Sequence, residues 1–120
     1  MHYLRKIVNL SDGEQIAIDL YPPNFYLDKK ETPIVLFMPG VVGNSSGFYI
    51  LRICELLRKN IGWRTAIFNR RGFGGMPILG NRLCGYELTE DFRQTILKFK
   101  EELPDAPIYL MGVSLGGMFV

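Results

Sequence analysis

The sequence predicts an α/β domain in which an antiparallel hairpin precedes a parallel βαβαβ sheet with helices on both faces. Three observations lead to this fold class. A turn of the Asp-Gly type, Ser11-Asp12-Gly13, separates two strand-like segments near the amino end. Continuous apolar runs then alternate with segments of helical periodicity, as βαβ units do. A length of 120 residues suits one small core, so we expect residues 1–120 to form a single domain.

The hairpin is expected over residues 3–10 and 14–20. In its second arm an apolar series alternates with a more polar one, which is the period of a half-buried strand. The apolar series is Ile16, Ile18 and Leu20, and the other is Gln15, Ala17 and Asp19. This pattern predicts a hairpin with one wet face. Residues 21–32, which contain Pro22-Pro23, are expected to be a polar loop.

Three short apolar runs follow, at residues 34–38, 65–68 and 107–111. A run without polar alternation suits a strand that is covered on both faces, as in parallel sheets. We therefore expect three buried parallel strands. The first of them ends in Pro39-Gly40.

Two helices are expected between these strands, over residues 48–60 and 87–102. Each has apolar residues at helical spacing, and Pro104 ends the second helix. The apolar positions are Ile50, Ile53, Cys54 and Leu57 in the first helix, and Leu88, Phe92, Ile96, Phe99 and Leu103 in the second. One helix before each later strand gives the crossover that parallel pairing requires.

The most informative motif is Gly112-Val113-Ser114-Leu115-Gly116, which fits the pattern GxSxG. It directly follows a predicted strand and opens a segment that can form a helix, which is the context of a nucleophile elbow. In that turn Ser114 is the nucleophile, Gly112 and Gly116 leave room for the close approach of the chain, and the Leu115 amide faces the substrate oxyanion. The alternative is an ordinary strand-ending turn in which Ser114 caps a helix.

A second oxyanion donor is expected after the first buried strand. There Gly40 lets the chain turn so that the Val41 amide faces the same pocket. Pro39-Gly40 also suits an ordinary turn, which is the alternative for this segment.

These features together resemble the α/β-hydrolase superfamily, and within it the lipase and esterase group called AB hydrolase family four, related to the ABHD one and three types. Three stretches carry the resemblance, and the arginine-glycine loop is the most specific to the group. They are Phe37-Met38-Pro39-Gly40, Phe68-Asn69-Arg70-Arg71-Gly72-Phe73-Gly74-Gly75, and Gly112-Val113-Ser114-Leu115-Gly116-Gly117. The resemblance implies a serine esterase or lipase that hydrolyses carboxylic esters, with acylglycerols or phospholipids as the substrate class. It implies no metal and no cofactor.

The partners that would activate the serine are missing from the sequence. In this fold the acid and the histidine of the triad follow the serine along the chain. The only histidine, His2, lies near the amino terminus, and Asp91 and Asp105 precede the elbow. We therefore expect the front half of a longer hydrolase, truncated after the elbow, with residues 107–111 exposed as an apolar edge prone to aggregation. The alternative is a short non-catalytic product that binds a partner or lipid through this unfinished edge.

Composition excludes several other classes. The net charge of +2 gives no basis for nucleic-acid binding. No apolar run approaches the roughly 18 residues of a membrane span, so the chain itself reads as soluble and intracellular, although group members often carry an apolar membrane anchor. Cys54 and Cys84 lack metal-ligand spacing and are expected to be buried thiols.

Overall fold

A computed structural model describes residues 3–38, 48–69 and 87–112 of the chain. Each expected strand and helix is present within about two residues of its predicted bounds. The elements are, in order, β1 (Leu4–Asn9), β2 (Gln15–Tyr21), the short 3₁₀ helix η1 (Phe25–Leu27), β3 (Ile34–Met38), α1 (Phe48–Ile61), β4 (Arg64–Phe68), α2 (Glu87–Glu102) and β5 (Ile108–Gly112).

The strands form one mixed sheet in the order β1-β2-β4-β3-β5. β1 and β2 form the expected antiparallel hairpin, and β2 also pairs antiparallel with β4. β3 pairs parallel with both β4 and β5. The prediction of an antiparallel pair in front of a parallel βαβαβ sheet is therefore confirmed.

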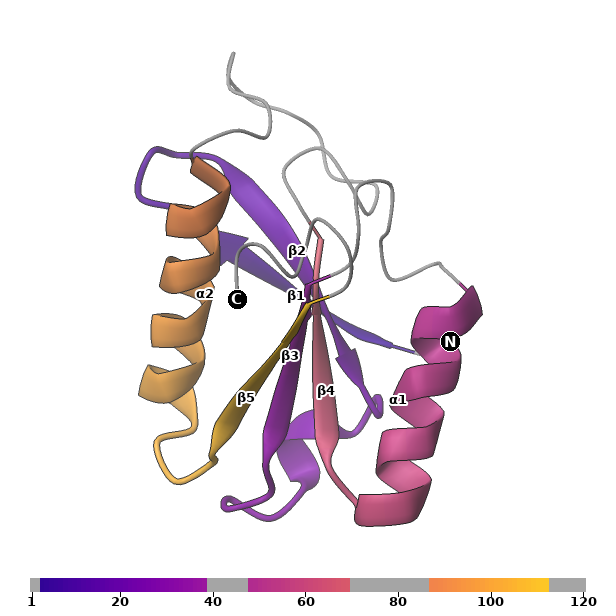
Figure 1. The fold of residues 1–120 in the computed structure, drawn as a ribbon. Coiled ribbons are helices and arrows are strands. Elements are labelled where there is room, and N and C mark those ends of the chain that lie inside the picture. Colours follow the sequence, from indigo (N-terminus) through magenta and orange to yellow (C-terminus); the bar gives the residue numbers. More distant parts are fainter. Residues whose placement is uncertain (1–2, 39–47, 70–86, 113–120) are drawn as a thin grey trace.

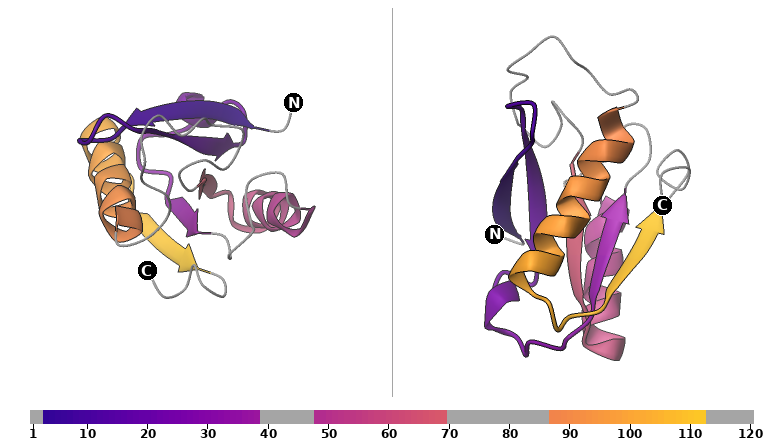
Figure 2. Two further views of the ribbon diagram at one scale, coloured as in Figure 1. Left: turned by 90° about the horizontal axis from the view of Figure 1, so that it is seen from above. Right: turned by 90° about the vertical axis from the view of Figure 1, so that its left-hand side faces the viewer.

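The two helices cover opposite faces of this sheet (Figures 1 and 2). On the α2 face, Phe92 and Phe99 join the larger core cluster with residues such as Leu36. On the α1 face, Ile50 and Cys54 pack with residues of β3 and β4 in a smaller cluster. The predicted apolar faces of both helices are confirmed for these residues, whereas the side chain of Leu88 lies outside the described part of the chain.

The expectation that one face of the second hairpin strand is exposed to solvent is wrong. Ala17 and Asp19, which alternate with the core residues of β2, are buried to 0% and 3% exposure. The reason is the sheet order, because β2 lies between β1 and β4 and not at an edge. Only β1, which is an edge strand, has mostly exposed residues.

The expected polar loop after the hairpin also contributes to the core. Phe25 of η1 is fully buried, with its ring centroid 6.1 Å from that of Phe99. The guanidinium of Arg64 lies 4.9 Å from the Phe25 centroid and donates to the carbonyl oxygens of Phe25 (3.0 Å) and Thr32 (2.7 Å). Burial lowers the pKa of this arginine, although the nearby Asp28 opposes the effect. Arg64 thereby fastens the loop beneath the amino end of β4.

β5 is not the buried strand that its apolar run predicts. Tyr109 and Leu110 are 49% and 42% exposed, and β5 pairs only with β3 within the part of the chain that the structure describes. The expected exposed apolar edge is confirmed. Tyr109 stacks on Trp63 at 4.9 Å between ring centroids, which shields part of this edge.

Candidate active site

The carboxyl ends of the three parallel strands lie at one edge of the sheet (Figure 1). We call this the carboxyl edge and the opposite one the amino edge. At the carboxyl edge Met38, the last residue of β3, pairs in register with Gly112, the last residue of β5. Sites of α/β proteins form outside the carboxyl ends of parallel strands.

The strand order favours one position along this edge. From β3 the chain passes through α1 to β4 on one side, and it then returns through α2 to β5 on the other side of β3. The direction of progress through the sheet thus reverses at β3. Such reversal points are where a crevice opens between neighbouring strand ends. The geometry therefore points to the ends of β3 and β5.

The sequence-predicted site residues belong to segments that start from these strand ends. Gly112 is described and closes β5. The others, which are Gly40, Val41, Ser114, Leu115 and Gly116, lie outside the described residues, as does His2, for which no catalytic role is expected. Their roles stay predictions.

The two acids that precede the elbow are both described. Asp91 is buried in α2, and Asp105 is exposed in the turn between α2 and β5, at the amino edge. Neither finding changes the expectation that the triad acid lies elsewhere.

A buried polar network that the sequence did not reveal lies at the carboxyl edge. Asn69, which directly follows β4, is fully buried, and its side-chain amide donates to Asp19 Oδ2 (2.9 Å) and to the carbonyl oxygen of Ala17 (3.1 Å). Arg5 donates to both carboxylate oxygens of Asp19, from Nε at 2.8 Å and from Nη2 at 2.9 Å. Its hydrogen bond to Asp19 raises the pKa of Arg5.

One signal could have revealed this network. Asp19 is the one polar residue in the otherwise apolar segment from Ile16 to Leu20. An acid there is a polar edge residue if the strand is half exposed, and it needs a buried partner if the strand is central. The sequence alone favoured the first interpretation because it did not predict β4 as the second neighbour of β2.

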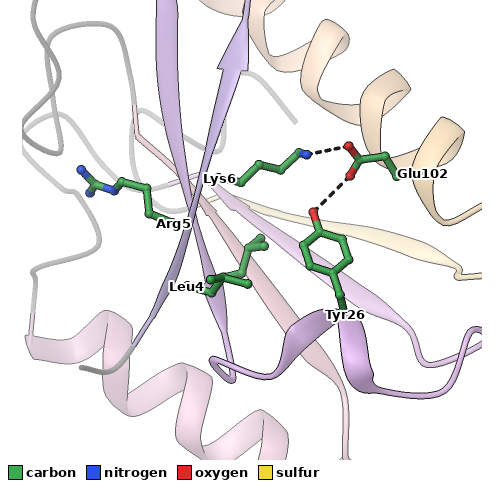
Figure 3. A pocket seen from close by; sticks show the side chains of 6 residues that line it. Leu4, Arg5, Lys6, Tyr26 and Glu102 are labelled. Atoms are coloured by element: carbon green, nitrogen blue, oxygen red, sulfur yellow. Dashed lines mark hydrogen bonds and ion pairs between the residues drawn. The ribbon is translucent and has the colours of Figure 1, made fainter.

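A groove of about 490 Å³ lies on the α2 face of the sheet, between β1, η1 and the end of α2. Its polar groups bind one another (Figure 3): Lys6 Nζ lies 2.6 Å from Glu102 Oε2, and the Tyr26 hydroxyl donates to Glu102 Oε1 at 3.1 Å. Arg5, although it borders the groove, points away from these three side chains. Burial, reinforced by Glu102, raises the pKa of Tyr26. The groove therefore offers a satisfied ion pair and not an acid–base pair aimed at a ligand.

Neither a metal-ligand cluster nor a helix of membrane-spanning length occurs in the described part of the chain. Among residues 3–38, 48–69 and 87–112, no group of three or more metal-ligating side chains comes together. None of the helices in those ranges is long and apolar enough to cross a membrane.

A family model covers most of the chain. Residues 33–120 match the model described as alpha/beta hydrolase fold. The matched region begins just before β3 and includes all of the predicted site residues.

The chain is also similar to individual hydrolases. The chain is 32% identical to a mouse protein named Phospholipase ABHD3, over 100% of the chain and 30% of that protein, and 27% identical to a human protein named Monoacylglycerol lipase ABHD2, over 97% of the chain and 27% of that protein. Among solved structures, the Pyrococcus furiosus esterase PF2001 matches with a TM-score of 0.77 at 17% identity, over 98% of this chain and 42% of the esterase chain. The chain thus spans about a third of the length of these curated relatives.

Proposed function

Because the chain belongs to the alpha/beta hydrolase fold family, we propose that the protein containing it hydrolyses carboxylic esters through an acyl-enzyme on Ser114. The observation that carries the proposal is the in-register pairing of Met38 with Gly112. The two segments with predicted catalytic roles begin directly after these paired residues.

Chain length limits how far apart the proposed groups can lie. Neighbouring strands are about 4.8 Å apart, and an extended chain advances at most about 3.5 Å per residue. Ser114 follows Gly112 by two residues, and Val41 follows Met38 by three. Both groups therefore start from adjacent points and are within reach of one substrate carbonyl, which supports a shared oxyanion site.

The proposed reaction follows from these roles. The hydroxyl oxygen of Ser114 attacks the ester carbonyl carbon while a histidine base accepts its proton. The amides of Leu115 and Val41 donate hydrogen bonds to the oxyanion, and the alcohol leaves with the proton from the histidine. Water then attacks the acyl-enzyme, releases the acid and restores Ser114. We place the histidine and its acid partner after Ser114 along the chain, outside this sequence.

The proposed substrate class comes from the relatives. One is named a phospholipase and another a monoacylglycerol lipase, and both names denote enzymes that cleave esters of glycerol lipids. We therefore propose acylglycerols or phospholipids as substrates. Since such lipids reside in membranes, the proposal includes association of the protein with a membrane surface.

Rapid-mixing kinetics test the proposal. The full native protein containing this chain is mixed with a chromogenic acyl ester, and an acyl-enzyme mechanism predicts a burst of alcohol release before the steady state. Ser114→Ala should abolish both burst and turnover, a loss of about 10⁴-fold or more. The matched control is Ser11→Ala in the exposed hairpin turn, which should leave both phases unchanged. Turnover that survives Ser114→Ala would sink the proposal.

A second candidate function, a non-catalytic module that binds a partner or lipid through the edge of β5, has one observation in its favour. Tyr109 and Leu110 are half exposed on a strand that pairs on one side only in the described part of the chain. The mass of the native protein separates the candidates. A mass well above that of 120 residues supports the hydrolase, and a folded native protein of 13.7 kDa without esterase activity supports the binding module.

A further inference from the structure

The buried network of Arg5, Asp19 and Asn69 lies at the edge where the esterase site is proposed. We infer that these three residues are positioning residues: they fix the carboxyl end of β4 so that the neighbouring strand ends present the proposed catalytic segments in a productive arrangement. The inference rests on the proposed function, because it concerns the rate of that same reaction. None of the three residues is proposed to touch the substrate.

Several hydrogen bonds hold the end of β4 against β2. Asn69 is bound to β2 through three hydrogen bonds, of which its backbone N–H makes one, to the carbonyl oxygen of Ala17 at 3.1 Å. The side-chain amide makes the other two, to the same carbonyl oxygen and to Asp19. Both the position and the orientation of the chain at its exit from β4 are therefore fixed.

The network contains a buried charge, the carboxylate of Asp19. The Asp19 side chain is only 4% exposed, whereas that of Arg5 is 41% exposed. A buried carboxylate is costly unless it is paired and hydrogen-bonded, and here the fork of Arg5 and the amide of Asn69 satisfy both oxygens. Two residues further along the pairing of β2 with β4, Tyr21 lies opposite Thr65, and neither residue carries a carboxylate. Pairing of β2 with β4 thus does not require a buried carboxylate, and the one at Asp19 lies beside Ile67, close to the carboxyl end of β4.

The network is linked to the proposed site through the pairing of neighbouring strands. β4 pairs with β3, and β3 pairs with β5, so that these three strand ends lie side by side. Packed interiors transmit small shifts because they contain few voids. A shift of about 1 Å in a catalytic constellation can lower the rate about 100-fold. Residues that lock such an edge therefore act on the rate without contacting the substrate.

The alternative is that the network only stabilises the fold, and the other end of the same strand provides a matched control. Arg64 is as deeply buried as Asn69, and it also binds carbonyl oxygens of another segment through its side chain. It lies at the amino edge, away from the proposed site. If the network is only structural, substitutions at the two ends should have the same kind of effect.

The experiment compares Asn69→Ala and Arg64→Met in the full native protein. For each variant, kcat and KM for a soluble acyl ester are measured per folded molecule, alongside the melting temperature. We expect Asn69→Ala to lower kcat about 10- to 100-fold with KM changed less than about threefold. We expect Arg64→Met to lower the melting temperature and to leave kcat within about twofold. Equal kcat for both variants, per folded molecule, would overturn the inference.

A third variant, Asn69→Asp, gives a readout that a purely structural role does not predict. The introduced carboxyl group can donate to Asp19 only while it is protonated, and the like charge of Asp19 raises its pKa. Within the described residues, the charged or ionisable groups around this pair include Arg5, which donates to Asp19, and Tyr3, whose pKa is raised by burial and further by Asp19. We expect the ratio of variant to native kcat to rise at least about threefold between pH 8 and pH 6. A constant ratio would contradict the inference.

The failures can be told apart. If the native protein hydrolyses esters through Ser114 but is indifferent to Asn69→Ala, only the positioning network is rejected. If turnover is absent or survives Ser114→Ala, the proposed function is rejected and the network is rejected with it.

Discussion

The two ends of β4 are fastened in different ways. At the amino edge Arg64 binds two backbone carbonyl oxygens and lies over the ring of Phe25, so it holds the loop after the hairpin against the core. At the carboxyl edge Asn69 and Asp19 join side chains of neighbouring strands, and Arg5 neutralises the buried carboxylate. One end attaches a loop, and the other fixes strand ends relative to one another. We therefore propose that the amino edge mainly stabilises the fold and that the carboxyl edge positions the site.

The first test removes the aromatic centre of the amino edge. Phe25→Ala should lower the free energy of unfolding by about 3–5 kcal/mol, because the fully buried ring packs against Phe99 and beneath Arg64. Chemical denaturation measures the loss. Leu27→Ala, in the same turn but at a side chain that is 85% exposed, is the control and should change stability by less than about 0.5 kcal/mol. A loss below about 1 kcal/mol for Phe25→Ala would show that this edge is not central to the core.

A second test concerns the thiol of Cys54, which packs against the sheet from α1. Burial raises the pKa of Cys54 from about 9 to about 12, although the neighbouring Thr65 side chain, whose hydroxyl favours the thiolate, partly opposes the shift. Since the folded pKa is the higher one, the thiol stabilises the fold fully below about pH 9, and this contribution is lost as the pH rises toward 12.

The measurement is the stability difference between pH 8 and pH 10 in the native protein and in Cys54→Ser. The native protein should lose about 1 kcal/mol more than the variant, because serine does not ionise in this range. Equal losses would mean that the thiol is accessible to water, and that the α1 face is packed less tightly than the structure indicates.

The third test is at the turn from α1 into β4. Gly62 has a φ of +74°, and its N–H donates to the Arg58 carbonyl oxygen at 3.0 Å, closing the helix. Gly62→Ala should cost about 1 kcal/mol because of backbone strain, since no atom lies within 4 Å of an added Cβ. Gly62→Asn should cost less, since asparagine tolerates this conformation. If the asparagine variant costs as much as the alanine variant, backbone conformation is not the cause.

The smallest effect is expected at the groove between β1, η1 and the end of α2. The ion pair of Lys6 with Glu102 is partly exposed, so Lys6→Ala should cost only about 0.2–1 kcal/mol and less at high salt. Thermal melts at low and high ionic strength measure this. The turnover per folded molecule should not change. A clear loss of turnover would give this groove a part in the chemistry and would contradict the comparison.

The order and bounds of the strands and helices could be predicted from the sequence because they depend on local periodicity. The apolar run of β3 likewise predicted its burial. The GxSxG pattern predicts a site after β5, which stays a prediction because Ser114 lies outside the described residues. Asp19 and Phe25 were misjudged for one physical reason. Their burial depends on partners far along the chain, and neither the neighbours of β2 nor the segment that covers η1 can be read from local spacing.

Covalent labelling tests most directly whether the carboxyl edge carries a serine nucleophile. The full native protein is treated with a serine-directed fluorophosphonate, digested, and analysed by peptide mass spectrometry. We predict a single adduct on Ser114 in the native protein and none in Ser114→Ala. An adduct elsewhere, or labelling that persists in Ser114→Ala, would contradict the account.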